Sequence, residues 1–521
     1  MDLSRRTIVT GAVGAGTLTA AAVAGAASPA AAADPTYIEI SHRPVNLADR
    51  LPPGATADTD ATQILVSALA ESPHVEWPHA TALRLTSTVT IPTGAILSGY
   101  AGALARIDHA RAGFEVAGSL RGVDISRVAA TSSLDGVGAW IVPDSVGASV
   151  ENVWISGDNA AGVAVGGSPD RGSRPGTAVD ALVRGVRVER SQAASSFNFR
   201  LDDSQGAGLI DCVGLGAELD NIKVRVHARD FRVVGGRYTG STNGDGIDAF
   251  CGGEGGFIGG GVIFEDNVRN GIVVKTDYPI GNAVSPADQA VSYGLPRQVI
   301  IDGVIVRRPG GSGISLHRSD AQDSDYAGTP SARLPWLADV TVSSAVIEDA
   351  AGSGLFINGF NFSVDNVQIL RPRGHGVHIH ANARHHRLAR VAVRAACFGN
   401  PTGTNDGFRL DGKHLWLTQC AAQGIVGDFV DDADYATATK YSRYGFISAV
   451  GTGATHHFAQ CMAYWHRVAP IAGEAIGYAK HTDGDYESYS SGWSLGGLWL
   501  RNNAGTLEKS AVGGTTGFTA V

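Results

Sequence analysis

Three aspartates, Asp220, Asp245 and Asp248, stand in one short part of the chain where glycine-led apolar pentads repeat. Two carboxylates that lie close together do not both ionise easily, so one pKa rises and the pair supplies an acid and a base at neutral pH. Such a pair is the minimum needed to hydrolyse a glycosidic bond. Lys275 and His317 end the next two pentads and add groups that would steady charge on a sugar. Residue type and spacing therefore predict catalytic roles for Asp220, Asp248, Lys275 and His317, and the role of Asp245 rests on a resemblance described below.

The pentads that position these residues share one pattern: a glycine or small residue, then apolar, any, apolar, any. Alternation of this kind predicts short strands whose second and fourth side chains point inward, while the third and fifth share an outward face. The pattern returns every 20 to 42 residues, which suits a solenoid with one or two turns per interval. Strong copies begin at Gly216, Gly246, Gly271, Gly313, Gly354, Gly376 and Gly407, and a weaker copy begins at Ser196.

If the pentads stack in register, their outward positions form a ladder of polar side chains along which a sugar chain would bind. Two long irregular segments, residues 276–298 and 318–334, are expected to wall a groove beside this ladder. The residues expected to bind the substrate are Arg200, Glu218, Glu254, Arg318, Asn358, His378 and His380.

Two further groups have residue types that bind metals. The histidines at 378, 380, 385 and 386 include a His-x-His pair, which places two rings on one face of a strand. Asp431-Asp432-Ala433-Asp434 offers oxygen ligands for calcium. Hydrogen bonding to sugar and a solvated acidic turn explain these groups more simply. We therefore predict no metal and no cofactor, with Ca²⁺ needed only if the protein is a lyase.

The N-terminal part of the chain predicts a leader followed by a cap. Arg5-Arg6, a weakly apolar run and Ala31-Ala32-Ala33 resemble a twin-arginine signal peptide over residues 1–33, which implies a secreted protein. Residues 58–70 begin with a helix N-cap and have helical apolar spacing. A helix there would cover the open end of a solenoid, whose edge would otherwise remain unpaired.

The cap region also carries a resemblance to a known superfamily. The helix opening on Asp-Thr-Asp-Ala, then Val89-Thr90-Ile91-Pro92, then Leu97-Ser98-Gly99, resembles the start of pectate-lyase-superfamily proteins. The resemblance implies an all-β fold, a right-handed parallel β-helix with an N-terminal capping helix. We expect the cap and first turns at 34–100, the β-helix at 101–440, and C-terminal turns with a second cap at 441–521.

A second resemblance concerns the aspartates. The segment 243–248 reads Asn-Gly-Asp-Gly-Ile-Asp and is similar to the Asn-Thr-Asp-Gly-Ile-Asp signature of polygalacturonase-like hydrolases, with Gly244 where threonine is usual. This likeness implies that Asp245 is a catalytic acid. The wider superfamily also contains polysaccharide lyases, uronate epimerases and phage tailspikes, so it specifies the fold more closely than the reaction.

These observations give three competing functions. The first is a secreted glycoside hydrolase acting on a polysaccharide or oligosaccharide. The second is a polysaccharide lyase or C5-epimerase on a uronate polymer, in which Lys275 or His317 removes the C5 proton and Arg200 steadies the carboxylate. The third is a non-catalytic glycan-binding protein. The net charge of −9 argues against a nucleic-acid partner. No later segment is apolar for long enough to predict a membrane partner, and tailspike-like relatives suggest a homotrimer.

Overall fold

The structure is a computed structural model, and it describes residues 44–508 except 129–135, 168–175, 190, 192–195, 226, 251–253, 277–296, 319–336, 428–437, 448–455, 465, 468, 473–493, 497–498 and 502–506. The predicted signal peptide, the acidic turn at 431–434 and nearly all of the two predicted loops lie outside the described residues. The description below concerns the unit that begins at Pro44.

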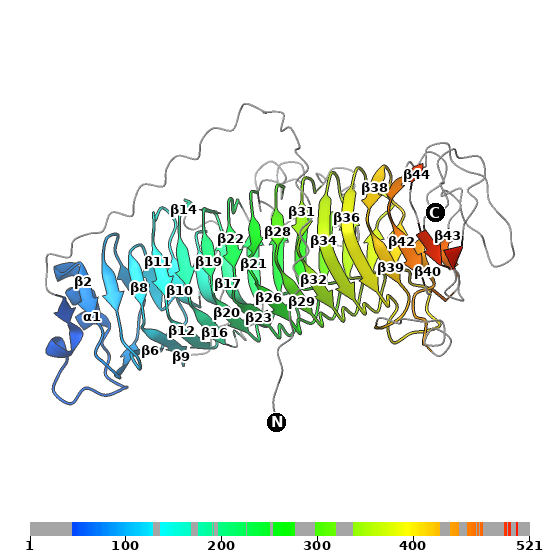
Figure 1. Cartoon of the computed structure of the whole chain (residues 1–521). Coiled ribbons are helices and arrows are strands. Elements are labelled where there is room, and N and C mark those ends of the chain that lie inside the picture. The colour runs from blue at the N-terminus through cyan, green and yellow to red at the C-terminus, as the bar shows by residue number, and fades with distance from the viewer. Residues whose placement is uncertain are drawn as a thin grey trace, which may run out of the picture. The chain divides into compact units, whose positions relative to one another are not determined.

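This unit is a right-handed parallel β-helix, as the resemblance implies, and its stacked strands form the solenoid that the pentads predict. Each turn around the site gives one strand to a fourteen-strand sheet and two strands to a thirty-strand sheet, and strands of successive turns pair in parallel. Figure 1 shows the labelled strands following one another in chain order along the stack. The fourteen-strand sheet consists of β4 (Val89–Ile91), β7 (Phe114–Val116), β10 (Val137–Ile141), β13 (Ala161–Val165), β17 (Phe197–Asp202), β21 (Ile222–Arg225), β24 (Ile247–Phe250), β27 (Ile272–Thr276), β30 (Ile314–Arg318), β33 (Leu355–Asn358), β35 (Val377–Ile379), β37 (Phe408–Leu410), β40 (Tyr444–Ile447) and β43 (Ala469–Ala472).

The other two sides of each turn belong to the thirty-strand sheet. Near the site these strands are β19 (Gly208–Ile210), β20 (Val213–Leu215), β22 (Arg232–Val234), β23 (Arg237–Thr239), β25 (Phe257–Gly259), β26 (Ile263–Glu265), β28 (Ile300–Asp302) and β29 (Ile305–Arg307). At the N-terminal end they are β1 (Val45–Asn46), β2 (His74–Glu76), β3 (Ala82–Leu85), β5 (Ile96–Ser98), β6 (Leu104–Ile107), β8 (Ser119–Arg121), β9 (Asp124–Arg127), β11 (Ser149–Glu151), β12 (Trp154–Gly157), β15 (Leu182–Arg184) and β16 (Arg187–Glu189). Toward the C-terminus they are β31 (Thr341–Ser343), β32 (Val346–Glu348), β34 (Ser363–Leu370), β36 (Arg387–Arg394), β38 (Leu415–Thr418), β39 (Ala421–Gln423), β41 (His456–Ala459), β42 (Met462–Tyr464), β44 (Ser494–Gly496), β45 (Trp499–Arg501) and β46 (Leu507–Glu508).

The core is an apolar column that each turn extends by one layer. On the fourteen-strand sheet, Ile222, Ile247, Ile272 and Ile314 pair in register, and all four side chains are buried. One turn alone could not bury these side chains, because each depends on the layers above and below it. A steric constraint also explains why a glycine opens each pentad. A Cβ on Gly246 would lie 2.4 Å from the carbonyl oxygen of Gly271 in the next turn.

The predicted capping helix is present as α1 (Thr62–Glu71), which follows the short 3-10 helix η1 (Leu47–Arg50). The carboxylate of Asp60 accepts hydrogen bonds from the backbone N–H and the hydroxyl of Thr62 in the turn before the helix, whereas the N-cap residue itself, Ala61, offers no side-chain cap. Leu65 and Leu69 are buried on the face that packs on the end of the stack. Among the residues that the structure describes, no helix has the length and apolar character that crossing a membrane requires.

Six of the pentads predict strands correctly, from β24 to β37, a seventh falls on β17 in a different register, and the one at Gly216 is wrong. Residues 216–220 form no strand but lie between β20 and β21, and β21 begins at Ile222. The pentad at Ser196 is displaced by two residues, because Phe199 is the residue that pairs with Ile222. In both turns an asparagine, Asn198 or Asn221, stands where later turns have glycine. Their amides bond inside the solenoid: Asn198 Nδ2 donates to Asn221 Oδ1 at 2.6 Å.

Candidate active site

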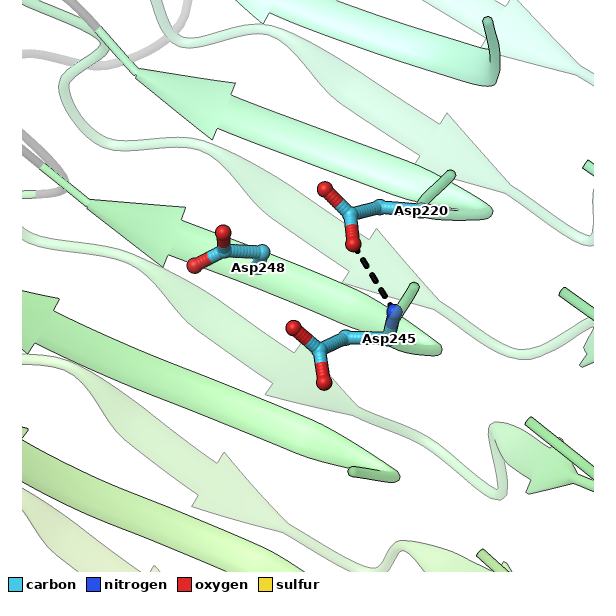
Figure 2. Close-up of side chains that lie close together, drawn as sticks. All are labelled: Asp220, Asp245 and Asp248. Atoms are coloured by element: carbon cyan, nitrogen blue, oxygen red, sulfur yellow. Dashed lines mark hydrogen bonds between the residues drawn. The ribbon is translucent and has the colours of Figure 1, made fainter. Parts of the chain in front are cut away.

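Three carboxylates meet on the outward face of the fourteen-strand sheet, as the sequence predicts. Asp248 points outward from β24, and Asp220 and Asp245 stand in the bends that lead into β21 and β24. One oxygen from each carboxylate lies within 4.8 Å of the others (Figure 2). All three residues are at most 5% exposed. The chain thus pays a desolvation cost to bring three ionisable groups together, which marks this place as a candidate site.

The bends that carry Asp220 and Asp245 stack on one another through capping side chains. The backbone N–H of Asp245 donates to Asp220 Oδ1 at 2.8 Å (Figure 2), and the backbone N–H of Asn270 donates to Asp245 Oδ1 at 2.7 Å. Asn270 then accepts from the N–H of Ser312 at 2.8 Å through Oδ1. Each side chain of this column therefore fixes the next bend, and each aspartate uses one carboxylate oxygen for that structural task.

Two lysines neutralise the carboxylate on β24. Lys223 Nζ lies 2.5 Å from Asp248 Oδ2 and 3.1 Å from Asp220 Oδ2, and Lys275 Nζ lies 3.2 Å from Asp248 Oδ2. The ring of Phe250 sits beside both ammonium groups, with its centroid 4.3 Å from Lys223 Nζ and 5.6 Å from Lys275 Nζ. The sequence reasoning identifies Lys275 but misses Lys223. The reason is that the pentad at Gly216 predicts Glu218 and Asp220 as the outward residues of this turn, whereas its strand begins at Ile222.

The environment separates the pKa values of neighbouring aspartates. Burial, together with the negative charges of Asp248 and Asp220, raises the pKa of Asp245 to about 7. Burial would also raise the pKa of Asp248, but the ammonium groups of Lys223 and Lys275 outweigh it and lower that pKa to about 2. Near neutral pH, therefore, Asp245 can carry a proton while Asp248 beside it stays ionised.

The ionised carboxylate retains an acceptor for a ligand. Asp248 Oδ2 takes both lysine contacts, whereas Asp248 Oδ1 is buried and has no hydrogen-bond partner among the described residues. A buried carboxylate oxygen without a partner is costly, so a water or a sugar hydroxyl at this oxygen would stabilise the site. The three carboxylates are also the one group among the described residues with the spacing of metal ligands. The two ammonium groups already supply the positive charge that a cation would bring.

Of the residues predicted to flank the carboxylates, His317 extends the site and Arg200 does not. His317 on β30 pairs directly with Lys275 on β27, and its Nδ1 lies 3.0 Å from the hydroxyl of Ser315. Arg200 on β17 is only 1% exposed and pairs with Asp202 at 3.1 Å. The guanidinium of Arg200 belongs to a buried ion pair within β17 and not to the charged group around Asp248, which corrects the expectation that Arg200 binds substrate.

Two other predicted substrate-binding residues do not join the outward column, and nothing is described for the side chain of a third. Glu218 lies in the bend before β21 instead of on a strand. Glu254 stands at a different corner of the solenoid, where its carboxylate pairs with Arg297 at 2.6 Å and with Arg229 at 3.8 Å. This corner is a ladder of alternating charges that stabilises adjacent turns. Arg318 ends β30, and its side chain lies outside the described residues.

The last three predicted residues lie farther along the same face. His378 is on β35, His380 follows it, and Asn358 ends β33, where it is 3% exposed. His378 and His380 gather around Phe356, with ring centroids 5.2 and 6.3 Å from it. The other two histidines of the predicted metal group point elsewhere. His386 is buried and accepts a hydrogen bond from the backbone of residue 362, and His385 stacks on His414.

Comparison with known proteins finds no matching family and no matching curated protein. Solved structures do match. The N-terminal fragment of gene product 12 of bacteriophage Phi29 has a TM-score of 0.56 and 13% identity, covering 91% of this chain and 74% of that chain. A mutant tailspike protein of E. coli bacteriophage HK620, in complex with a pentasaccharide, has a TM-score of 0.51 and 10% identity, covering 88% and 80%. At such identities the likeness shows the fold alone.

Proposed function

We propose that this protein is an exported enzyme that hydrolyses glycosidic bonds of a polysaccharide at Asp220, Asp245 and Asp248. The observation that carries the proposal is the pair of neighbouring carboxylates with opposite pKa shifts. Acid catalysis at the glycosidic oxygen needs a protonated carboxyl, and activation of water needs an ionised one. The tailspike with its pentasaccharide adds support, since it is a protein of this fold with a sugar chain bound.

Each residue has a defined task in this reaction. Asp245 donates its proton to the glycosidic oxygen as the bond from that oxygen to the anomeric carbon breaks. A water attacks the anomeric carbon, and the proton that it releases passes to the ionised carboxylate of Asp248. Lys223 and Lys275 keep Asp248 ionised by their contacts of 2.5 and 3.2 Å. The site gains one proton from water and gives one proton to the glycosidic oxygen. Transfer of the gained proton to Asp245 then restores the starting state.

The ion pairs also bear on the alternative of a uronate lyase or epimerase. In that reaction Lys275 or His317 would act as the base, and Lys275 could do so only as a neutral amine. Its ammonium instead contacts the ionised carboxylate of Asp248 at 3.2 Å, and such a contact favours the charged form. This contact counts against Lys275, so a lyase or epimerase would depend on His317 as its base, whereas hydrolysis uses carboxylates that are already in place.

The test is a screen of neutral and acidic polysaccharides in which product mass and ultraviolet absorbance are read together. We expect products that have gained water and no absorbance from an unsaturated sugar. Asp245→Asn and Asp248→Asn should each lower kcat by about 100-fold or more, the usual contribution of a general acid or base. Asp302→Asn is the matched control, because this carboxylate lies on β28 of the other sheet and accepts from Ser343 at 2.6 Å.

Two results would contradict the proposal. Unsaturated products from the wild type would indicate elimination. Equal turnover in the wild type and in both aspartate variants would place the chemistry elsewhere.

A further inference from the structure

An aromatic ring lies on the outward face of the sheet beyond the carboxylates. Phe356 is the outward residue of β33, between the buried Leu355 and Ile357, and its own side chain is partly exposed. The pairing register runs from Asp248 through Val273 and Ser315 to Phe356. Phe356 is thus three strands from Asp248 in one column, about 14 Å at a spacing of about 4.8 Å between strands.

Three imidazoles surround this ring. The ring centroids of His317, His378 and His380 lie 6.0, 5.2 and 6.3 Å from that of Phe356, with interplanar angles between 63° and 68°. His375 extends the group, 5.1 Å from His378. An apolar ring face beside ring nitrogens matches a pyranose, which offers C–H groups on its faces and hydroxyls at its rim.

Two of these imidazoles, His375 and His378, are held in the neutral form. The Nδ1 of His375 accepts a hydrogen bond from the backbone N–H of Asp406 at 3.0 Å, which fixes the neutral form with its proton on Nε2. Burial lowers the pKa of His375 to about 3 and also lowers the pKa of His378. His375 and His378 can therefore exchange hydrogen bonds with hydroxyls but offer no charge to a carboxylate.

The cations of this face are already paired. Among the described lysine and arginine side chains on the outward face from β21 to β37, each contacts a carboxylate. A uronate unit would have to displace one of these carboxylates, whereas an uncharged sugar would not. The pairs are Lys223 and Lys275 with Asp248, Arg225 with Asp202 at 2.8 Å, and Arg409 with Asp411 at 2.7 Å.

We propose that Phe356 and the imidazoles of His317, His378 and His380 form a binding subsite for an uncharged pyranose unit, so that the polysaccharide bound along this face is neutral. A pyranose unit of an extended chain is about as long as one turn is high. A chain from Asp248 to Phe356 would therefore hold several units, which implies attack within a chain. Cleavage of that chain rests on the proposed function, whereas binding at Phe356 does not.

The test measures binding by calorimetry with six-unit oligosaccharides of neutral glucans, mannans and galactans, and with six-unit oligogalacturonate and oligomannuronate. We expect a neutral oligosaccharide to bind more tightly than either acidic one. Phe356→Leu keeps the apolar bulk but removes the ring, and should weaken binding about tenfold, while Phe356→Tyr restores most of it. Trp154→Leu is the control: Trp154 is 48% exposed on β12 of the other sheet, beside Arg187, and its loss should leave binding unchanged.

The outcomes separate this proposal from the proposed function. Unchanged binding in Phe356→Leu, tighter binding of the acidic oligosaccharides, or no binding of any neutral one would overturn the subsite. Binding that depends on Phe356, without hydrolysis of any bound oligosaccharide, would support the subsite and count against the hydrolase.

Discussion

Asp245 lies in the bend before β24, and Asp248 lies three residues later on the strand itself. Both carry a carboxyl group, yet their surroundings give the two groups different chemistry. Asp248 faces two ammonium groups, and Asp245 faces other carboxylates. Because Asp245 Oδ1 is held by the backbone and side-chain amides of Asn270 at 2.7 and 2.9 Å, its orientation is fixed before any substrate arrives. Such fixed geometry reduces the reorganisation needed during reaction.

The raised pKa of Asp245 predicts how activity depends on pH. The acid acts only when protonated, and its pKa lies at about 7, so kcat/KM should fall as the pH rises through that value. Since the pKa of Asp248 is lowered to about 2, its own protonation should reduce activity only in strong acid. A pH profile on the best substrate checks this. Activity that stays constant up to the range where lysines titrate would contradict the assignment.

Lys223 predicts a shift of the acid side of the same profile. Lys223→Met removes the ammonium nearest Asp248 and leaves only Lys275 to oppose burial. The pKa of Asp248 should then rise, so activity is lost at a higher pH than in the wild type, and Lys223→Arg should restore part of the difference. The measurement is the acid limb of kcat/KM in each variant. Lys413→Met, outside this face, is the control; equal shifts in both methionine variants would point to a nonspecific effect.

At the level of elements, sequence alone predicts the solenoid well because its core needs only alternating apolar residues. The pentads from Gly246 to Gly407 fall on β24 to β37. The prediction fails where an asparagine replaces the glycine that opens a turn, since Asn221 can bond inside the solenoid at a place where other side chains would clash. The amide of Asn221 does so with Asn267 Oδ1 at 2.8 Å. Because of Asn221, the predicted strand fell on residues 216–220 instead of on β21, and Lys223 was not recognised as an outward residue.

The site was less predictable than the fold, for a different reason. The three aspartates could be found because their residue type and spacing already suggest acid and base. The partners of Glu254 could not, because they depend on which residues of the neighbouring turns lie opposite. Arg200 pairs with Asp202 of its own strand, and the sequence did not show that this pair is buried. Turns differ in length because their bends and loops differ. Which residues of adjacent turns face each other is therefore fixed only by the register of the folded strands.

The opening glycine of β24 supplies an element-scale prediction. In Gly246→Ala the new Cβ would lie 2.4 Å from Gly271 O and 2.6 Å from a ring carbon of Phe264, so the strand must shift. We expect a loss of about 1–3 kcal/mol of stability and lower activity, because Asp245 and Asp248 flank this residue. Thermal unfolding and kcat measure the two effects. Gly208→Ala is the matched control, with its nearest atom 3.7 Å away; equal effects in both variants would argue against a specific clash.

At the scale of the whole molecule, stability is the sum of turns that contact only their neighbours. The register supports this view, since β5 pairs with β2 on one side and with β8 on the other. A fold of this kind tolerates great change in sequence while each layer stays apolar, which agrees with a TM-score of 0.56 at 13% identity. The active site has no such freedom, because its charges belong to three particular turns.

This one-dimensional architecture predicts that damage stays local. Leu97→Ala removes a buried side chain from β5 near the capped end, and such a change costs about 2–5 kcal/mol. Hydrogen exchange should become faster in β2, β5 and β8 while β24 and β27 keep their protection, and kcat at low temperature should be unchanged. Ile272→Ala, buried in β27, should give the reverse pattern and lower kcat. Faster exchange throughout the solenoid in both variants would mean that the turns unfold together, and the site would then depend on every layer of the stack.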